Sequence, residues 1–211
     1  MKAVLVLSAL LSAAISPAQP DGTGVPYTSA YDFRSGIYLT FEEFRNNAPG
    51  IPIDALSDDQ GLRIRDIEEE IGRSYHVDST GRRVRIDAGR IWGYCTHDIV
   101  RVAAGNGFFR IGRMGALAHL IIERTVHDYD PYSSGYGGYT MQEERMVDMM
   151  TGELLPFDVA GMDKALLRDP VLSEEFRALP KKERRQAATL YRFLQRYNAR
   201  HPLRMHPSGI R

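Results

Sequence analysis

The sequence has few means of holding a fold together other than a buried core. Cys95 is the single cysteine among 211 residues, so no disulfide can form within the chain. Beyond the N-terminus, no apolar run approaches the roughly 20 residues that span a bilayer. The 27 basic and 27 acidic residues balance, so the overall charge does not indicate a nucleic-acid binder. These absences predict a globular protein of one domain with no transmembrane segment and no nucleic-acid partner.

Motifs for nucleophilic and phosphate chemistry are also missing. No Gly-x-Ser-x-Gly occurs, and the Gly105–Gly107 segment lacks the strand-to-helix context and the lysine of a phosphate loop. The run from Asp128 begins like a calcium loop but has Ser133 where glycine is required. Cys95 and His97 would share a strand face, yet the apolar run around the thiol predicts a buried, inert cysteine. We therefore assign no catalytic residue and no cofactor, and a non-catalytic protein is favoured.

The first 18 residues have the pattern of a cleaved secretory signal. Lys2 supplies a positive start, residues 3–15 form an uncharged and almost wholly apolar run, and small residues flank Pro17. No cysteine follows this run, which excludes the lipoprotein route. Residues 1–18 are thus predicted to be a signal peptide and residues 19–35 a flexible leader. The exported protein would be periplasmic or secreted.

Residues 36–158 have the turn and strand signals of a mainly antiparallel β domain. Thr40 and Glu43 form a capping-box pattern for one short N-terminal helix. Gly105–Gly107 and Thr151–Gly152 mark hairpin turns, since glycine accepts the positive φ angles that tight hairpins need. Residues 117–126 predict a strand or a short helix, followed by a loop rich in Tyr, Gly and Ser. The predicted fold class is α+β, an antiparallel β-meander (an open sheet or a small, partly closed barrel) with C-terminal helices.

The C-terminal part is predicted to be helical and strongly basic. Helices are expected over 162–168, 171–179 and 181–199, within a helical part at 159–203 that precedes a tail at 204–211. From residue 181 onward, nine Lys or Arg residues stand against the single acid Glu183. The basic face of the last helix would bind a protein partner or an anionic surface, or would dock on the acidic remainder of its own chain. The candidate binding residues are Arg184, Arg185, Arg192 and Arg196.

His119, Glu123 and His127 have the most metal-like spacing in the chain. On a helix, residues four apart share a face, so two imidazoles and a carboxylate would converge as zinc ligands. On a strand, the two histidines would lie about 26 Å apart, at about 3.3 Å per residue, and would not share an ion. Neighbouring β-branched residues favour the strand. A metal site and an ordinary polar face both stay open.

Five sequence blocks occur in order over most of residues 36–203. They are GIYLTFEEFRNNAP at 36–49, IWGYC at 91–95, GNGFFRI at 105–111, MMTGE at 149–153 and YNARHPL at 197–203. This set resembles a group of short exported proteins of unknown function from Gram-negative bacteria. The resemblance implies export and a single domain, and it implies no activity, cofactor or site residue.

Together these observations favour an exported, non-catalytic protein that acts by binding. The expected contact is an envelope protein or an anionic surface, through the basic C-terminal helix. One alternative is a metal-dependent envelope hydrolase built on His119, Glu123 and His127. Another is a structural subunit with no separate ligand site.

Overall fold

A computed structural model of the chain describes residues 24–64, 66–105, 107–129 and 136–209. For residues 125–129 and 136–138 it describes the backbone alone. The predicted signal peptide, at residues 1–18, lies outside the described residues. None of the helices in the described ranges has the length and apolarity needed to cross a membrane.

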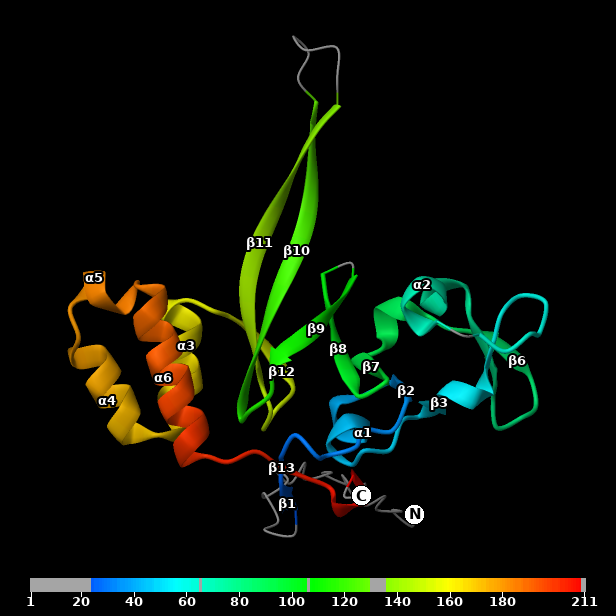
Figure 1. Cartoon of the computed structure of the whole chain (residues 1–211), viewed down its shortest axis with the longest axis horizontal. Coiled ribbons are helices and arrows are strands. Elements are labelled where there is room, and N and C mark those ends of the chain that lie inside the picture. The colour runs from blue at the N-terminus through cyan, green and yellow to red at the C-terminus, as the bar shows by residue number, and fades with distance from the viewer. Residues whose placement is uncertain (1–23, 65, 106, 130–135, 210–211) are drawn as a thin grey trace, which may run out of the picture.

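The fold is α+β, as predicted, and is built around an eight-stranded, mostly antiparallel sheet curled into half a barrel (Figure 1). The strand order is β12-β11-β10-β9-β8-β7-β2-β3. Strands β7 to β12 follow one another both along the chain and across the sheet, which is the predicted meander. The strands are β2 (Gly36–Tyr38), β3 (Ile51–Pro52), β7 (Gly93–Thr96), β8 (Ile99–Ala104), β9 (Gly107–Arg113), β10 (Leu117–Tyr129), β11 (Tyr136–Asp148) and β12 (Glu153–Pro156).

The turns between these strands carry the positive φ angles that the sequence predicted. His97 and Asp98, with φ of 51° and 60°, join β7 to β8, a pair of left-handed residues that suits a two-residue hairpin loop. Gly105 precedes β9 with φ 61°, and Gly152 lies between β11 and β12 with φ 76°. The hairpins predicted at Gly105–Gly107 and at Thr151–Gly152 are therefore confirmed.

A second, three-stranded sheet lies at one end of the molecule (Figure 1). It consists of β4 (Leu56–Ser57), β5 (Tyr75–Val77) and β6 (Arg83–Arg85), with α2 (Ile67–Glu70) and the 3-10 turns η1 (Ile53–Ala55), η2 (Ile71–Arg73) and η3 (Ala88–Arg90). The sequence did not predict α2, where the side chain of Asp66 accepts a hydrogen bond from the Glu68 N–H as the N-cap. A core cluster that includes Ile67, Ile86 and Tyr94 joins this sheet to the main one.

The segment predicted as a flexible leader is instead ordered from residue 24 onward. β1 (Val25–Pro26) pairs antiparallel with β13 (Arg204–Met205), ahead of the last 3-10 turn, η5 (Pro207–Gly209). Tyr31 and Phe33 are buried in the core cluster that covers the main sheet. Large aromatic side chains bury enough apolar area to hold a segment that has no long secondary structure of its own. The short helix α1 (Phe41–Arg45) follows, with the Thr40 hydroxyl accepting from the Glu43 N–H as the capping box predicted.

The helical part packs against β10 and β11. It consists of α3 (Val159–Ala165), the 3-10 turn η4 (Leu166–Arg168), α4 (Pro170–Ala178), α5 (Lys181–Arg184) and α6 (Ala187–Arg200). The single helix predicted over 181–199 is wrong, because Gln186 is extended (φ −74°, ψ 131°) and separates α5 from α6. Helix α5 has no buried residue that would fix it as a continuation of α6, whereas Leu190 and Leu194 of α6 are buried.

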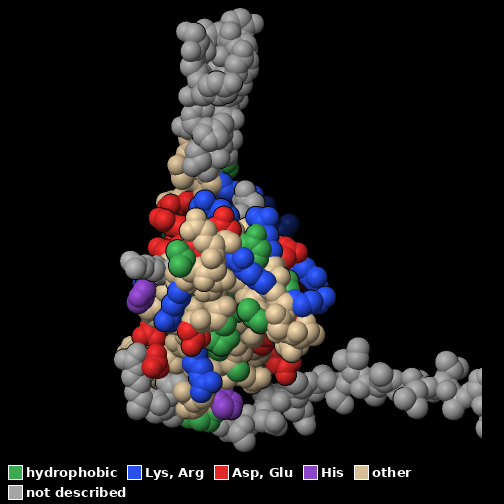
Figure 2. Space-filling model, turned by 90° about the vertical axis from the view of Figure 1, so that its right-hand side faces the viewer, with side chains coloured by type: hydrophobic (Ala, Val, Ile, Leu, Met, Phe, Trp, Pro, Cys, Tyr) green, Lys and Arg blue, Asp and Glu red, His purple; other side chains and the backbone are tan. Residues whose placement is uncertain are grey.

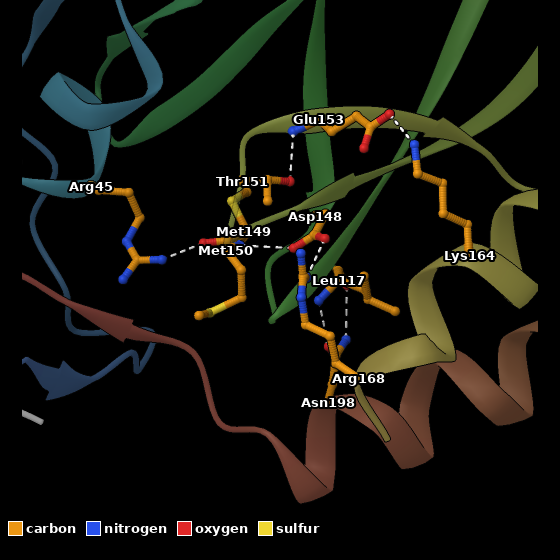
Figure 3. Close-up of polar contacts among 10 residues, drawn as sticks. All are labelled: Arg45, Leu117, Asp148, Met149, Met150, Thr151, Glu153, Lys164, Arg168 and Asn198. Carbon is orange, nitrogen blue, oxygen red and sulfur yellow. Dashed lines mark hydrogen bonds and ion pairs between the residues drawn. The ribbon is translucent and has the colours of Figure 1, made fainter. Parts of the chain in front are cut away.

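Polar contacts fix the root of the long β10–β11 hairpin to the helices (Figure 3). The Asn198 side chain, on α6, accepts from the Leu117 N–H at 2.7 Å and donates to the Leu117 carbonyl at 2.9 Å. On the partner strand, directly opposite Leu117, the Asp148 carboxylate forms an ion pair with Arg168 and accepts from the Met150 N–H at 2.9 Å. The first residue of β10 and the last residue of β11 are thus held on one rigid base.

Candidate functional site

The β10–β11 hairpin extends well beyond the rest of the sheet. The two strands pair over 13 positions each, from Leu117 with Asp148 to Tyr129 with Tyr136. Strand β9 pairs only with His119 and Leu120, and β12 pairs only with residues 145–148. Residues 121–129 and 136–144, which we call the arm, therefore have no neighbouring strand on either edge within the described residues. Nine residues per strand give the arm a length of about 30 Å, and it projects from the sheet (Figure 1). Its inner end contacts the body, because Ile122 is buried in the core and the Glu144 carbonyl accepts from the Phe157 N–H at 3.1 Å.

The two edges of the arm differ in charge. On β10, residues 121–129 include Glu123, Arg124 and Asp128. On β11, residues 136–142 read Tyr-Gly-Gly-Tyr-Thr-Met-Gln and contain neither a charged residue nor a proline. Open strand edges are templates for another strand, and proteins commonly protect them with charged residues or proline. The β11 edge lacks that protection over residues 136–142, and its charged residues, Glu143 and Glu144, lie at the root of the arm.

Exposed apolar side chains lie near the root of the arm. Tyr139 and Met141 are each 53% exposed, and Ile121 is 43% exposed. Tyr139 and Met141 are two residues apart on β11 and therefore share one face, and the cross-strand pairing of Met141 with Arg124 places Arg124 on that face too. The neighbouring ion pair from Arg124 to Glu143 is 3.8 Å long and exposed. This face therefore combines two uncovered apolar groups with a charged border.

His119 lies at the root of the arm and is a packed contact between the sheet and α6. Its Nε2 atom is 3.2 Å from the Tyr191 hydroxyl and 3.4 Å from a carboxylate oxygen of Glu144, and its ring packs edge-on to Phe157 and Tyr191. Burial lowers the pKa of His119, although the Glu144 carboxylate acts in the opposite direction. A neutral, enclosed imidazole fits a structural role at this position.

The metal interpretation of His119, Glu123 and His127 required a helix, and the structure has a strand there. Glu123 is exposed and accepts a hydrogen bond from Gln142 at 2.8 Å, whereas His119 is buried toward α6. Eight residues of strand separate the two histidine backbones by about 26 Å, and the His127 side chain lies outside the described residues. In the described part of the chain, no group of three His, Cys, Asp or Glu side chains is placed to hold a metal ion. The hydrolase alternative thus loses the helical geometry on which it depended.

The predicted basic face is largely paired with acidic residues of its own chain. Three of the four candidate arginines lie beside a carboxylate from α3, α4 or α5, and the fourth, Arg185, is exposed with no ion pair among the described side chains. Exposed ion pairs contribute only about 0–1 kcal/mol each, but they do neutralise the charge that an anionic surface would meet. The pairs are Arg184–Asp163 (3.6 Å), Arg192–Glu183 (3.3 Å) and Arg196–Glu175 (2.5 Å).

The opposite end of the molecule also mixes charges of both signs. Figure 2 shows the side that carries β6, where Lys and Arg side chains are interspersed with Asp and Glu. Within the helical part, the three arginine–carboxylate pairs match the second interpretation of its charge, a basic helix paired within its own chain.

The Asp169 carboxylate is buried and has three polar partners, Arg200, Leu172 and His201. It accepts from the Arg200 Nε at 2.6 Å, from the Leu172 N–H at 3.1 Å and contacts the His201 Nε2 at 2.9 Å. Burial raises the pKa of Asp169, but the hydrogen bonds from Arg200, Leu172 and His201 outweigh it and hold that pKa well below its usual value. Because the folded-state pKa is depressed, this stabilisation is present above the unfolded-state pKa of about 3.9 and is lost as the pH falls below it.

Replacing Asp169 with asparagine is expected to lower the free energy of unfolding by about 2 kcal/mol at pH 7, the value of a hydrogen bond to a charged group. The difference from wild type should shrink as the pH falls below about 3.9, because the Asp169 carboxyl of the unfolded wild-type chain then takes up a proton while that of the folded state stays charged. Urea unfolding at pH 7 and at pH 3 measures both. The exposed Glu174→Gln variant of the same helix is the control. A difference that stays constant over this pH range would contradict the assignment.

The remaining sequence candidates are buried or lie apart from the arm. Cys95 is fully buried, and burial raises the pKa of its thiol to about 12. Of the tyrosines, Tyr31 is buried in the core and Tyr139 is exposed on the arm. The sequence interpretation missed the arm, because it treated residues 129–139 as a loop. The signal that would have found it is the two runs of equal length, 117–129 and 136–148, on either side of a Gly- and Ser-rich centre.

Comparison of the chain with protein-family models, with curated proteins and with solved structures found no match.

Proposed function

We propose that this chain is an exported, non-catalytic binding protein that accepts an extended strand of a protein partner along the β11 edge of its arm. The observation that carries the proposal is the open edge itself, since residues 136–143 pair with β10 on one side and have no strand on the other within the described chain. Strand addition supplies main-chain hydrogen bonds for affinity and side-chain contacts for selectivity. Tyr139 and Met141 offer such contacts. Export rests on the signal pattern of residues 1–18.

The energetics of the arm support a partner. A two-stranded hairpin is marginally stable in water by itself, and three or more strands, or packing against a helix, are needed for independent stability. The arm root is anchored by Asn198, by the Asp148–Arg168 ion pair and by the burial of Ile122 in the core, whereas no strand outside the hairpin pairs with residues 123–129 and 136–143 among the described residues. A third strand at the β11 edge would give the arm the three strands that independent stability requires.

Binding is expected to fail when charges are placed on the unprotected edge. In the Tyr139→Lys/Met141→Lys variant, we expect partner affinity to fall at least about tenfold, since lysines on an edge strand oppose strand addition. The unfolding midpoint should not change, because both side chains are 53% exposed and surface substitutions typically alter stability by less than about 0.5 kcal/mol. The matched control is Leu167→Lys/Val171→Lys, which changes two exposed apolar residues of the helical part.

The measurement is crosslinking in intact native cells from a photoreactive residue placed at position 140, which the lysine variant leaves unchanged, or at position 167, followed by mass spectrometry. A discrete protein crosslinked through an extended segment from position 140, lost in the lysine variant and kept in its control, supports the proposal. An Arg184→Glu/Arg192→Glu variant should keep this crosslink, because both arginines are paired within the chain. Crosslinks that persist in the arm variant and disappear in the arginine variant would contradict the proposal in favour of the basic face.

A further inference from the structure

The charge pattern along β11 selects one orientation for a strand of the same sequence. Residues 136–142 are uncharged, whereas Glu143 and Glu144 lie at the root of the arm. Parallel pairing of two such strands would place Glu143 against Glu143, and directly opposed like charges destabilise a sheet. Antiparallel pairing instead places the acidic root of each strand against the uncharged outer part of the other. The strand is therefore self-complementary in the antiparallel orientation only.

Antiparallel pairing centred on Thr140 also matches the apolar residues. In this register Tyr139 is opposite Met141 of the partner subunit, and the same pair recurs across the two-fold axis. Aromatic and apolar cross-strand pairs of this kind stabilise antiparallel strands. Glu143 would be opposite Gly137 of the partner subunit, so no acidic residue is opposed by another. A two-fold axis at Thr140 thus gives an isologous contact, the commonest kind in homodimers.

The two edges of the arm explain why such an assembly would stop at two copies. Pairing through β11 gives a four-stranded antiparallel sheet in the order β10-β11-β11-β10, which exceeds the three strands needed for independent stability. Its outer edges are then both β10, which carries Glu123, Arg124 and Asp128. The unprotected edge is covered and the charged edge is left outside, a distribution that prevents further strand addition.

We infer that the strand bound at the β11 edge is β11 of a second copy, so that the protein forms a two-fold dimer through its arms. This inference rests on the proposed function, because it names the partner of the same edge. The arms are about 30 Å long and antiparallel, so the two bodies lie at opposite ends of the shared sheet.

Disulfide trapping of the purified full chain tests the register. In a Thr140→Cys variant the two introduced thiols lie directly opposite each other, where antiparallel strands place Cα atoms about 4.5–5.5 Å apart, within the disulfide range. The matched control is Gln142→Cys, an exposed position two residues along the same strand face. There the two Cα atoms would be about 14 Å apart, beyond disulfide reach. Wild-type protein supplies the baseline, because Cys95 is fully buried.

We expect at least about tenfold more crosslinked dimer from Thr140→Cys than from Gln142→Cys under mild oxidation. Light scattering on untreated protein should give a dimer mass, and a monomer mass for the Tyr139→Lys/Met141→Lys variant. Equal crosslinking at both positions, a monomer at every concentration, or open-ended oligomers would each overturn the inference. If the protein is a monomer and position 140 still crosslinks to a different protein in cells, the dimer is wrong and the proposed function stands. If position 140 crosslinks to nothing, both fail.

Discussion

Replacing Asn47 with alanine is expected to lower the free energy of unfolding by about 3–4 kcal/mol. The side chain is fully buried; it accepts from the Arg34 N–H at 2.8 Å and donates to the Asp32 carbonyl at 2.9 Å. Alanine would leave both backbone groups without this partner, and an unsatisfied buried polar group costs about 1–3 kcal/mol. The Tyr38 hydroxyl, 3.3 Å from the same side-chain oxygen, keeps its donation to the Arg34 carbonyl. The loss should therefore come mainly from the two backbone groups.

Asn47→Gly separates these hydrogen bonds from the backbone conformation. Asn47 has φ 50°, in the left-handed region, where glycine is unstrained and alanine costs about 1 kcal/mol more. Urea unfolding should therefore rank wild type above Asn47→Gly, and Asn47→Gly above Asn47→Ala. An Asn47→Gly variant as stable as wild type would show that the buried hydrogen bonds of Asn47 do not contribute to the free energy of unfolding.

Gly161→Ala is expected to destabilise the fold by about 3 kcal/mol, at the upper end of the usual cost of overpacking. A Cβ atom at this position would lie 1.9 Å from the carbonyl oxygen of Pro156, the last residue of β12. Both atoms belong to rigid elements, so helix α3 has to move off the sheet to make room. Helix propensity alone predicts the opposite sign, since alanine favours a helix by up to about 1 kcal/mol over glycine.

Thermal unfolding monitored by circular dichroism checks this prediction. The control is Gly72→Ala, where the new Cβ would have no atom within 4 Å, and its midpoint should stay close to that of wild type. A Gly161→Ala variant with an unchanged or raised midpoint would show that helix propensity outweighs the close approach of α3 to β12.

The features that the sequence predicted depend on residues close together in the chain. The capping pair Thr40 and Glu43, the Gly105 turn and the stop at His201 are local, because each is satisfied within a few residues. The leader was mispredicted because Phe33 is buried against residues far along the chain, including Leu203. No local pattern specifies a contact at that separation.

The candidate site was missed for the same physical reason. Gly137 and Gly138 have low intrinsic β-propensity, and only their pairing with Asp128 and His127 across the hairpin makes them strand. Composition likewise identified the arginines of the C-terminal helices but not their partners, because Arg184 and Asp163 are separated by a whole helix. The excess of one charge in a segment does not specify which carboxylates the fold places beside it.

The pairing of Val25 with Met205 also determines when the fold can form. The Tyr31 hydroxyl donates to the His206 carbonyl at 2.9 Å, and Arg204 donates to the Gly24 carbonyl at 2.7 Å, across 175 and 180 residues. Contacts of such high sequence separation cannot form on a nascent chain until residues 204–206 have been synthesised, and closing them slows folding. Late closure slows the completion of the fold, which suits the export that we propose, since a chain is threaded across a membrane before it has folded.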